Sequence, residues 1–113
     1  MKKLFCYLVD FGSVSSGNTY TSELAFASDS DFELAAIRTD LSDTTEADMT
    51  ITKEGGEQLS NAAISLRAIA GSKNPINLFE KFVVSRGSKW TLSASVSAGT
   101  NQPLQVQFWG YKN

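Results

Sequence analysis

The chain has 113 residues and contains no histidine, the most common general base and a frequent metal ligand. A Ser-His-Asp or Cys-His mechanism is therefore excluded within this chain. A single cysteine, Cys6, excludes an intramolecular disulfide and with it a disulfide-stapled secreted scaffold. Because Cys6 lies in an apolar stretch between Phe5 and Tyr7, we expect a buried free thiol without a redox role. We expect neither enzymatic activity nor a cofactor or metal.

Charged residues are also scarce, at 19% of the chain, and the formal net charge is -2. Lysine and arginine are scattered rather than clustered, so we expect no nucleic-acid partner. No apolar stretch is long enough to span a bilayer, so we expect no membrane partner. The apolar run over 4–9 follows two lysines but is shorter than the apolar core of a signal peptide. We interpret 3–11 as a first strand, buried on both faces or lying on a neighbour.

Apolar and polar residues alternate with a period of two along much of the chain, which is typical of half-buried strands. The clearest case is the segment from Trp90 to Ala98, where apolar positions alternate with Ser and Thr. The pattern predicts strands over 3–11, 20–26, 32–37, 47–52, 82–85, 89–97 and 103–111, separated by Gly, Ser and Asn turns. Residues 39–46 are predicted to form a polar loop. Residues 57–70 fit a short helix or an irregular segment with a short strand at 64–66.

These elements predict an all-β fold: one antiparallel β-sandwich domain over 1–113, jelly-roll-like, with seven to eight strands and at most one short helix. The only two prolines, Pro75 and Pro103, fall in a loop and at a strand entry, where a missing N–H does no harm. Edge strands rich in Ser and Thr, with few lysines, leave hydrogen-bonding edges open. We therefore expect self-association into a dimer or trimer.

Two acidic segments resemble reactive sites in composition. Asp29-Ser30-Asp31 could begin a calcium loop, but no glycine and no glutamate follow at the required spacing, which favours a turn. The second segment, residues 40–48, contains four carboxylates, which could serve glycoside hydrolysis if two of them faced each other across a cleft. Their place in a polar loop favours ordinary solvated side chains. These four residues are Asp40, Asp43, Glu46 and Asp48.

The last strand places aromatic residues on both of its faces. Trp90 and Phe108 share the parity of the core positions, whereas Trp109 shares the opposite parity with two glutamines. The outward-facing ring can belong to a second apolar surface, a protein interface or a sugar-stacking platform. Arg86, in the predicted turn Arg86-Gly87-Ser88, either braces that turn or reaches a partner carboxylate. The candidate interface residues are Trp109, Tyr111, Gln105, Gln107 and Arg86.

Several short motifs occur in an order that carries a family resemblance. They are an acidic turn before Phe32-Glu33-Leu34, then Met49-Thr50-Ile51-Thr52, Gly56-Glu57-Gln58-Leu59-Ser60-Asn61, Pro75, Arg86-Gly87-Ser88 and the terminal Gly110-Tyr111-Lys112. Over roughly residues 20–112 the chain resembles small β-sandwich structural proteins of tailed bacteriophages, namely capsid decoration or cement proteins and minor virion proteins. The resemblance implies a jelly-roll-like sandwich, self-association and docking on major capsid protein, with no catalytic residues.

The resulting hypothesis is a structural virion protein that decorates and stabilises a bacteriophage capsid by docking on the lattice of the major capsid protein. Such a protein is made in the cytoplasm of the bacterial host and is located on the capsid exterior. Many weakly bound copies on a symmetric lattice gain avidity through effective concentration. The alternative is a phage tail or receptor-binding module that recognises carbohydrate. A glycan binder should expose Trp109 or Tyr111 in a concave groove, whereas a capsid protein should bury them between chains.

Overall fold

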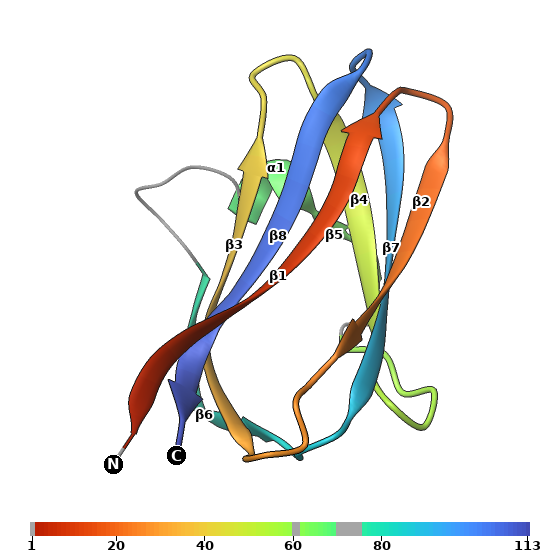
Figure 1. The fold of residues 1–113 in the computed structure, drawn as a ribbon. Helices are drawn as coiled ribbons and strands as arrows, with labels where there is room; N and C mark the ends of the chain where they lie inside the picture. Colours follow the sequence, from red (N-terminus) through yellow and green to blue (C-terminus); the bar gives the residue numbers. More distant parts are fainter. Residues whose placement is uncertain (1, 60–61, 70–75) are drawn as a thin grey trace.

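The computed structural model describes residues 2–59, 62–69 and 76–113. Within these ranges the chain forms eight strands and one helical turn (Figure 1). Their bounds are β1 Lys3–Val14, β2 Thr19–Ala25, β3 Phe32–Leu41, β4 Glu46–Thr52, β5 Ile64–Ser65, α1 Leu66–Ile69, β6 Ile76–Val84, β7 Lys89–Ala98 and β8 Gln102–Lys112. Among the described residues, no helix has the length and apolar character needed to cross a membrane.

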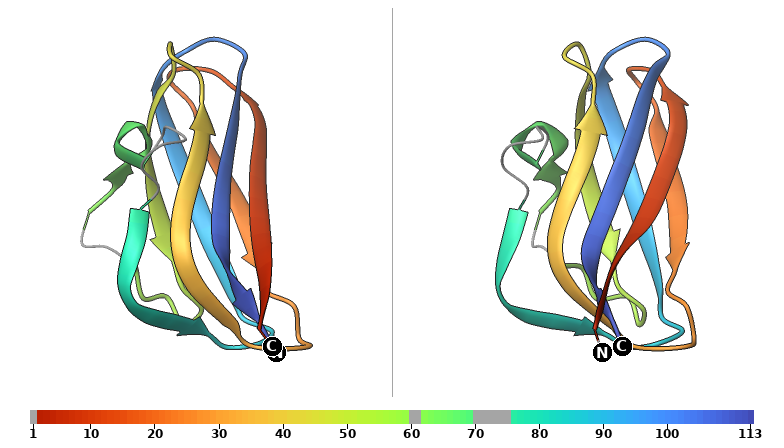
Figure 2. Two further views of the ribbon diagram at one scale, coloured as in Figure 1. Left: turned by 90° about the vertical axis from the view of Figure 1, so that its left-hand side faces the viewer. Right: turned by 60° about the vertical axis from the view of Figure 1, so that its left-hand side comes forward.

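The strands form two four-stranded antiparallel sheets. Sheet A has the order β1-β8-β3-β6, and sheet B has the order β2-β7-β4-β5. The two sheets lie face to face, and the two chain termini lie close together at one end (Figure 2). The chain turns back on itself near its middle, so that strands of its first half pair antiparallel with strands of its second half. These pairs are β1–β8, β2–β7, β3–β6 and β4–β5. The predicted all-β antiparallel sandwich is confirmed.

The core lies between the sheets and follows the predicted alternation. Trp90, Leu92, Ala94 and Val96 are buried on β7, and the residues between them face outward. On β8 the buried set is Leu104, Val106 and Phe108. The rings of Trp90 and Phe108 meet edge to face with their centroids 6.1 Å apart, a favoured arrangement for buried aromatic rings.

Three strands are clearly longer than the sequence predicts. β6 begins at Ile76, although the sequence predicts a strand only from residue 82. β1 continues past residue 11 to Val14 through a bulge between Asp10 and Gly12, where Gly12 has a φ of 75° and donates its N–H to Asp10 Oδ1. β3 continues to Leu41, so the predicted loop over 39–46 is wrong for its first residues. Thr39 is buried there, and its hydroxyl donates to the Gln105 carbonyl at 2.6 Å. A satisfied hydroxyl lets a polar residue enter the core.

The ambiguous segment contains both predicted elements. Ile64–Ser65 forms the short strand β5, and the single helical turn α1 follows it directly. From α1, Arg67 reaches the connection between β3 and β4: its Nη2 atom donates to the Ser42 carbonyl at 2.7 Å, and its Nε pairs with Glu46 at 3.0 Å. Arg67 therefore fastens the helical turn to the sandwich. Pro75 and residues 60–61 and 70–75 lie outside the described residues.

Candidate interaction surface

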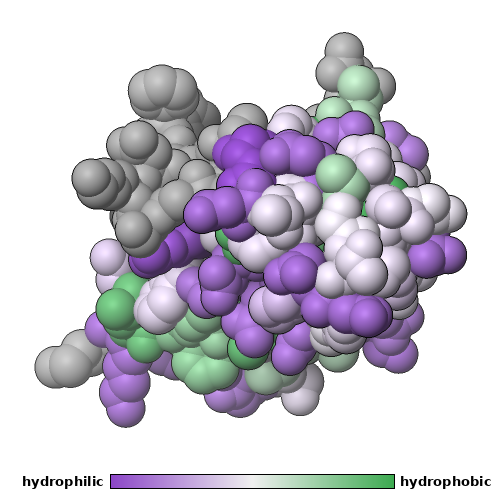
Figure 3. Space-filling view, turned by 90° about the horizontal axis from the view of Figure 1, so that it is seen from above, coloured by the Kyte–Doolittle hydropathy of each residue, from purple (hydrophilic) through white to green (hydrophobic). Residues whose placement is uncertain are grey.

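The outward face of sheet B is polar. Its strands are lined by Ser and Thr, and Thr21, Ser93 and Thr50 lie side by side across β2, β7 and β4. The turns at one end of the sandwich are also mostly hydrophilic or neutral when seen from above, and hydrophobic residues gather along the lower margin of that view, on the side of sheet A (Figure 3). The two broad faces of the molecule are therefore chemically different.

The outward face of sheet A carries most of the large hydrophobic side chains that the described structure leaves exposed. Leu4 is 63% exposed, Leu8 50%, Val83 59% and Tyr111 40%. Leu4 pairs with Tyr111, Tyr111 with Glu33, and Glu33 with Val83, so these residues form one row across all four strands. Exposed apolar side chains that gather on one face are typical of interaction sites, whereas scattered ones are ordinary.

Trp109 lies near the middle of this face. It belongs to β8, between Cys6 on β1 and Ala36 on β3, so its large ring has small neighbours on both sides. The indole is half-buried, and its Nε1 donates to Gln107 Oε1 at 2.9 Å. The register of Trp109 thus confirms its predicted outward orientation. Gln107, on the same strand, holds the ring in place.

Cys6 shares the outward face with Trp109. Its thiol is free and half-buried, and Sγ donates to the Tyr7 carbonyl at 3.7 Å. Burial raises the pKa of the Cys6 thiol, which keeps it in the less reactive protonated form. The prediction of a buried thiol was wrong, because Cys6 is only half-buried on an edge strand with one face turned outward.

The predicted glutamines extend the same face toward the other end of β8. Gln107 lies opposite Arg38, and Gln105 lies between Asp10 on β1 and Asp40 on β3. The outward face of sheet A therefore changes from apolar near the start of β1 to polar near its end. Four of the five predicted interface residues share this face: Trp109, Tyr111, Gln105 and Gln107.

Tyr111 borders a pocket of about 240 Å³ near the chain termini. Two charged groups that line the pocket form an ion pair, since Lys2 Nζ lies 2.6 Å from Glu33 Oε2. The lining residues are Lys2, Asp31, Glu33, Val83, Tyr111 and Asn113. The pocket places an exposed phenol ring beside polar groups.

Arg86 does not share the sheet face and instead braces the turn between β6 and β7. Its backbone N–H donates to Asp31 Oδ1 at 2.9 Å, and its Nε lies 3.3 Å from the same oxygen. These two donors, the amide first, hold the pKa of Asp31 below its ordinary value of 3.8. Gly87 in this turn has a φ of 76°, which a residue with a side chain rarely adopts.

The second carboxylate of the Asp29-Ser30-Asp31 turn is also paired. Lys112 Nζ lies 3.1 Å from Asp29 Oδ1, and the hydrogen bond from Lys112 lowers the pKa of Asp29. The two aspartates thus pair with different cations, one on β8 and one in the turn between β6 and β7, as expected of a turn that fastens β2 and β3 to the rest of the sandwich. In the described part of the chain, no group of three or more His, Cys, Asp or Glu residues is placed to hold a metal ion.

The acidic segment 40–48 is divided between the two sheets, and Asp43 lies in the turn between β3 and β4. Asp40 lies on sheet A, whereas Asp48 lies on sheet B and is exposed. Glu46 forms its ion pair with Arg67. The sequence could not separate these residues, because they become distant only when the chain crosses from one sheet to the other between β3 and β4.

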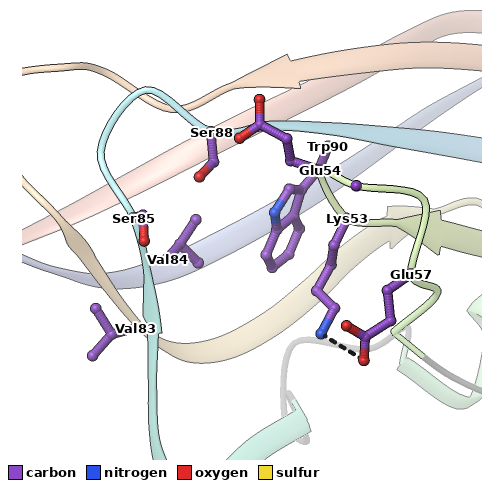
Figure 4. A pocket seen from close by; sticks show the side chains of 9 residues that line it. Lys53, Glu54, Glu57, Val83, Val84, Ser85, Ser88 and Trp90 are labelled. Carbon is purple, nitrogen blue, oxygen red and sulfur yellow. Dashed lines mark ion pairs between the residues drawn. The ribbon is translucent and has the colours of Figure 1, made fainter.

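A polar cleft of about 430 Å³ lies between the turn that follows β4 and the turn that joins β6 and β7 (Figure 4). Val84 and Trp90 point into it, Val83 points away, and Lys53 forms an ion pair with Glu57 at 3.5 Å across its rim (Figure 4). Trp90 is only 3% exposed, so little of its ring is available for a ligand to stack on. The lining residues are Lys53, Glu54, Gly55, Glu57, Val83, Val84, Ser85, Ser88 and Trp90.

Leu4, Leu8 and Val83 belong to the apolar face but were missed as candidate residues. The continuous apolar run over 4–9 hides the alternation that would separate an inward from an outward residue. A signal was present, because Leu4 and Leu8 share the parity of Cys6 and of the charged residues Lys2 and Asp10. When the charged residues of an edge strand share one parity, the side chains of that parity are expected to face outward.

Comparison of the sequence with models of known protein families finds no match, and no curated protein matches the chain.

Proposed function

We propose that the chain is a structural protein of a bacteriophage virion, which docks on the major capsid protein from the capsid exterior and stabilises the shell. The observation that carries this proposal is the chemical difference between the two broad faces, with exposed Leu, Val and Tyr side chains and the half-buried Trp109 gathered on sheet A. Interface cores are enriched in aromatic residues, and Trp109 and Tyr111 lie on this face. The order of motifs that resembles decoration proteins gives independent support.

We also infer that the folded ribbon of paired strands is a jelly roll. Eight strands in two sheets, with the pairs β1–β8, β2–β7, β3–β6 and β4–β5, suit that architecture, which viral shell proteins commonly use. A rigid sandwich of this kind presents one broad face without rearrangement. Rigid presentation limits the entropy cost of docking many copies on a lattice.

The proposal is tested with shells of major capsid protein that lack this chain. The purified chain should bind these shells, saturate at a fixed copy number per shell and raise the temperature at which they come apart. Trp109→Ala should weaken binding about tenfold or more per contact, as truncation of a central interface aromatic commonly does. Thr91→Ala, which alters an exposed residue of sheet B, is the matched control and should bind like the unmodified chain. Absence of saturable binding, or equal losses in both variants, contradicts the proposal.

A second candidate function is carbohydrate recognition by a phage tail or receptor-binding module. The pocket beside Tyr111 favours it, because an exposed phenol ring next to the carboxylates of Asp31 and Glu33 can stack on a sugar and bind its hydroxyl groups. Retention on an immobilised polysaccharide, lost in Tyr111→Ala, together with no binding to shells, would establish this function instead. Binding to shells without retention on polysaccharide excludes it.

A further inference from the structure

The edge of sheet A formed by β1 is the longest free edge of the sandwich. β1 has 12 residues, compared with 9 in β6, 7 in β2 and 2 in β5, the other edge strands of the described residues. It pairs with β8 on one side, and no strand of the described structure is hydrogen-bonded to its other side, although β2 contacts part of it across the sandwich. Its N-terminal half diverges from β2 (Figure 1). A long strand edge of this kind presents unpaired N–H and C=O groups to another chain.

The outward side chains of β1 and the preceding residue are arranged symmetrically about Cys6, with opposite charges at the two ends. From Lys2 to Asp10 they are basic, Leu4, Cys6, Leu8 and acidic. Leu4 lies as far before Cys6 as Leu8 lies after it, and Lys2 lies as far before it as Asp10 lies after it. The bulge that follows Asp10 ends the regular part of the strand, so the regular edge runs over Lys3–Asp10 with Cys6 beside its midpoint.

We propose that two copies of this chain form a two-fold symmetric dimer by antiparallel pairing of their β1 strands, centred on Cys6. In this register Leu4 faces Leu8 of the second copy, Lys2 faces Asp10 of the second copy, and the two Cys6 residues face each other. On the opposite side of the strand, Phe5 faces Tyr7 of the second copy. Cross-strand apolar, aromatic and opposite-charge pairs are the contacts that stabilise antiparallel sheets.

Other registers lack this match. Centring the pair on Phe5 places Lys2 opposite Leu8, and centring it on Tyr7 places Leu4 opposite Asp10; both oppose a charge and an apolar side chain. Phe5 is itself 40% exposed although it has the inward parity of β1, so pairing covers a ring that the single chain leaves open. The Lys2 ammonium already pairs with Glu33, so its contact with Asp10 selects the register more than it adds affinity.

The dimer joins two copies of sheet A into one continuous sheet, and their outward faces become one continuous surface. This inference concerns the chain alone and does not rest on the proposed capsid function. A dimer that fails to bind shells would refute only the capsid function, whereas a monomer that binds shells would refute only the dimer.

Sedimentation of the full chain over the micromolar range tests the dimer first. We expect a species of twice the chain mass of 12.2 kDa. Leu8→Lys should weaken the dimer about a hundredfold, because two symmetry-related contacts each lose about tenfold. The double variant Leu4→Glu with Leu8→Lys should restore it, since each new carboxylate then faces a new ammonium group only in this register. A chain that stays monomeric, forms a trimer or is unaffected by Leu8→Lys overturns the proposal, as does a double variant without rescue.

Oxidation of Cys6 supplies an independent measurement. Antiparallel partners have Cα atoms about 4.5–5.5 Å apart, within the range of a disulfide. Diamide takes two protons and two electrons from the two thiols, and one S–S bond forms between the copies. We expect a covalent dimer from the unmodified chain, none from Cys6→Ser, and none from Cys6→Ser combined with Thr21→Cys, which moves the thiol to sheet B. Crosslinking that is equally fast in the last variant reflects random collision and refutes the interface.

Discussion

Phe108 and Trp109 are consecutive aromatic residues on β8 that face opposite sides of sheet A, and their truncation should therefore have different effects on stability. Phe108 is fully buried and packs edge to face on Trp90. Phe108→Ala removes that contact and leaves a cavity, which should lower the free energy of unfolding by about 4 kcal/mol. Trp109→Ala removes a larger ring, but water fills the space, so only the covered part of the ring is lost. We expect about 1–2 kcal/mol for that loss.

Urea unfolding of both variants measures this difference. Tryptophan fluorescence can report both transitions, because Trp90 is present in each variant and is buried in the folded state. A loss of 4 kcal/mol is a large part of the stability of a domain of this size, so Phe108→Ala can fail to fold. Phe108→Leu, expected to cost about 1 kcal/mol, then serves in its place beside Trp109→Leu. If truncation of Trp109 destabilises the chain as much as truncation of Phe108, the assignment of the two faces is wrong.

Two further predictions concern backbone contact and pH. Gly110→Ala should destabilise the fold by about 2 kcal/mol, because a Cβ at Gly110 would overlap the Glu33 carbonyl oxygen and lie 2.8 Å from the Phe32 ring. The loss should be measured as a lower melting temperature. An unchanged melting temperature contradicts this close approach. The lowered pKa of Asp31 contributes stability that is present above its ordinary value of 3.8 and is lost as the pH falls below it. Asp31→Asn should therefore reduce the difference in urea midpoint between neutral and acidic pH, and an unchanged difference would show that the Arg86 contacts do not matter in solution.

The regular strands were predictable because each obeys one period over many residues. From Trp90 to Ala98 and from Leu104 to Phe108 the alternation alone separates inward from outward side chains. The strand over 3–14 was harder, because a run of apolar residues conceals the period and the bulge at Gly12 shifts it. Its position at a sheet edge depends on pairing with β8, about a hundred residues later, which local sequence cannot reveal.

The candidate face was predictable in part. The parity of Trp109, Tyr111, Gln105 and Gln107 follows from one strand, so their common face could be found without a structure. The contributions of Leu4 and Val83 depend on the order β1-β8-β3-β6, which brings residues from both ends of the chain into one row. The interaction of Arg86 with Asp31 likewise joins two turns that are far apart in sequence.

Quantitative mass spectrometry of purified phage particles tests the central claim most directly. If the chain decorates a capsid, it should be present in a fixed ratio to the major capsid protein. That ratio should be constant between preparations and preserved through repeated density-gradient purification. A few copies per particle would instead indicate the tail module. Absence from particles, in cells that produce the chain abundantly, would contradict a structural role in the virion.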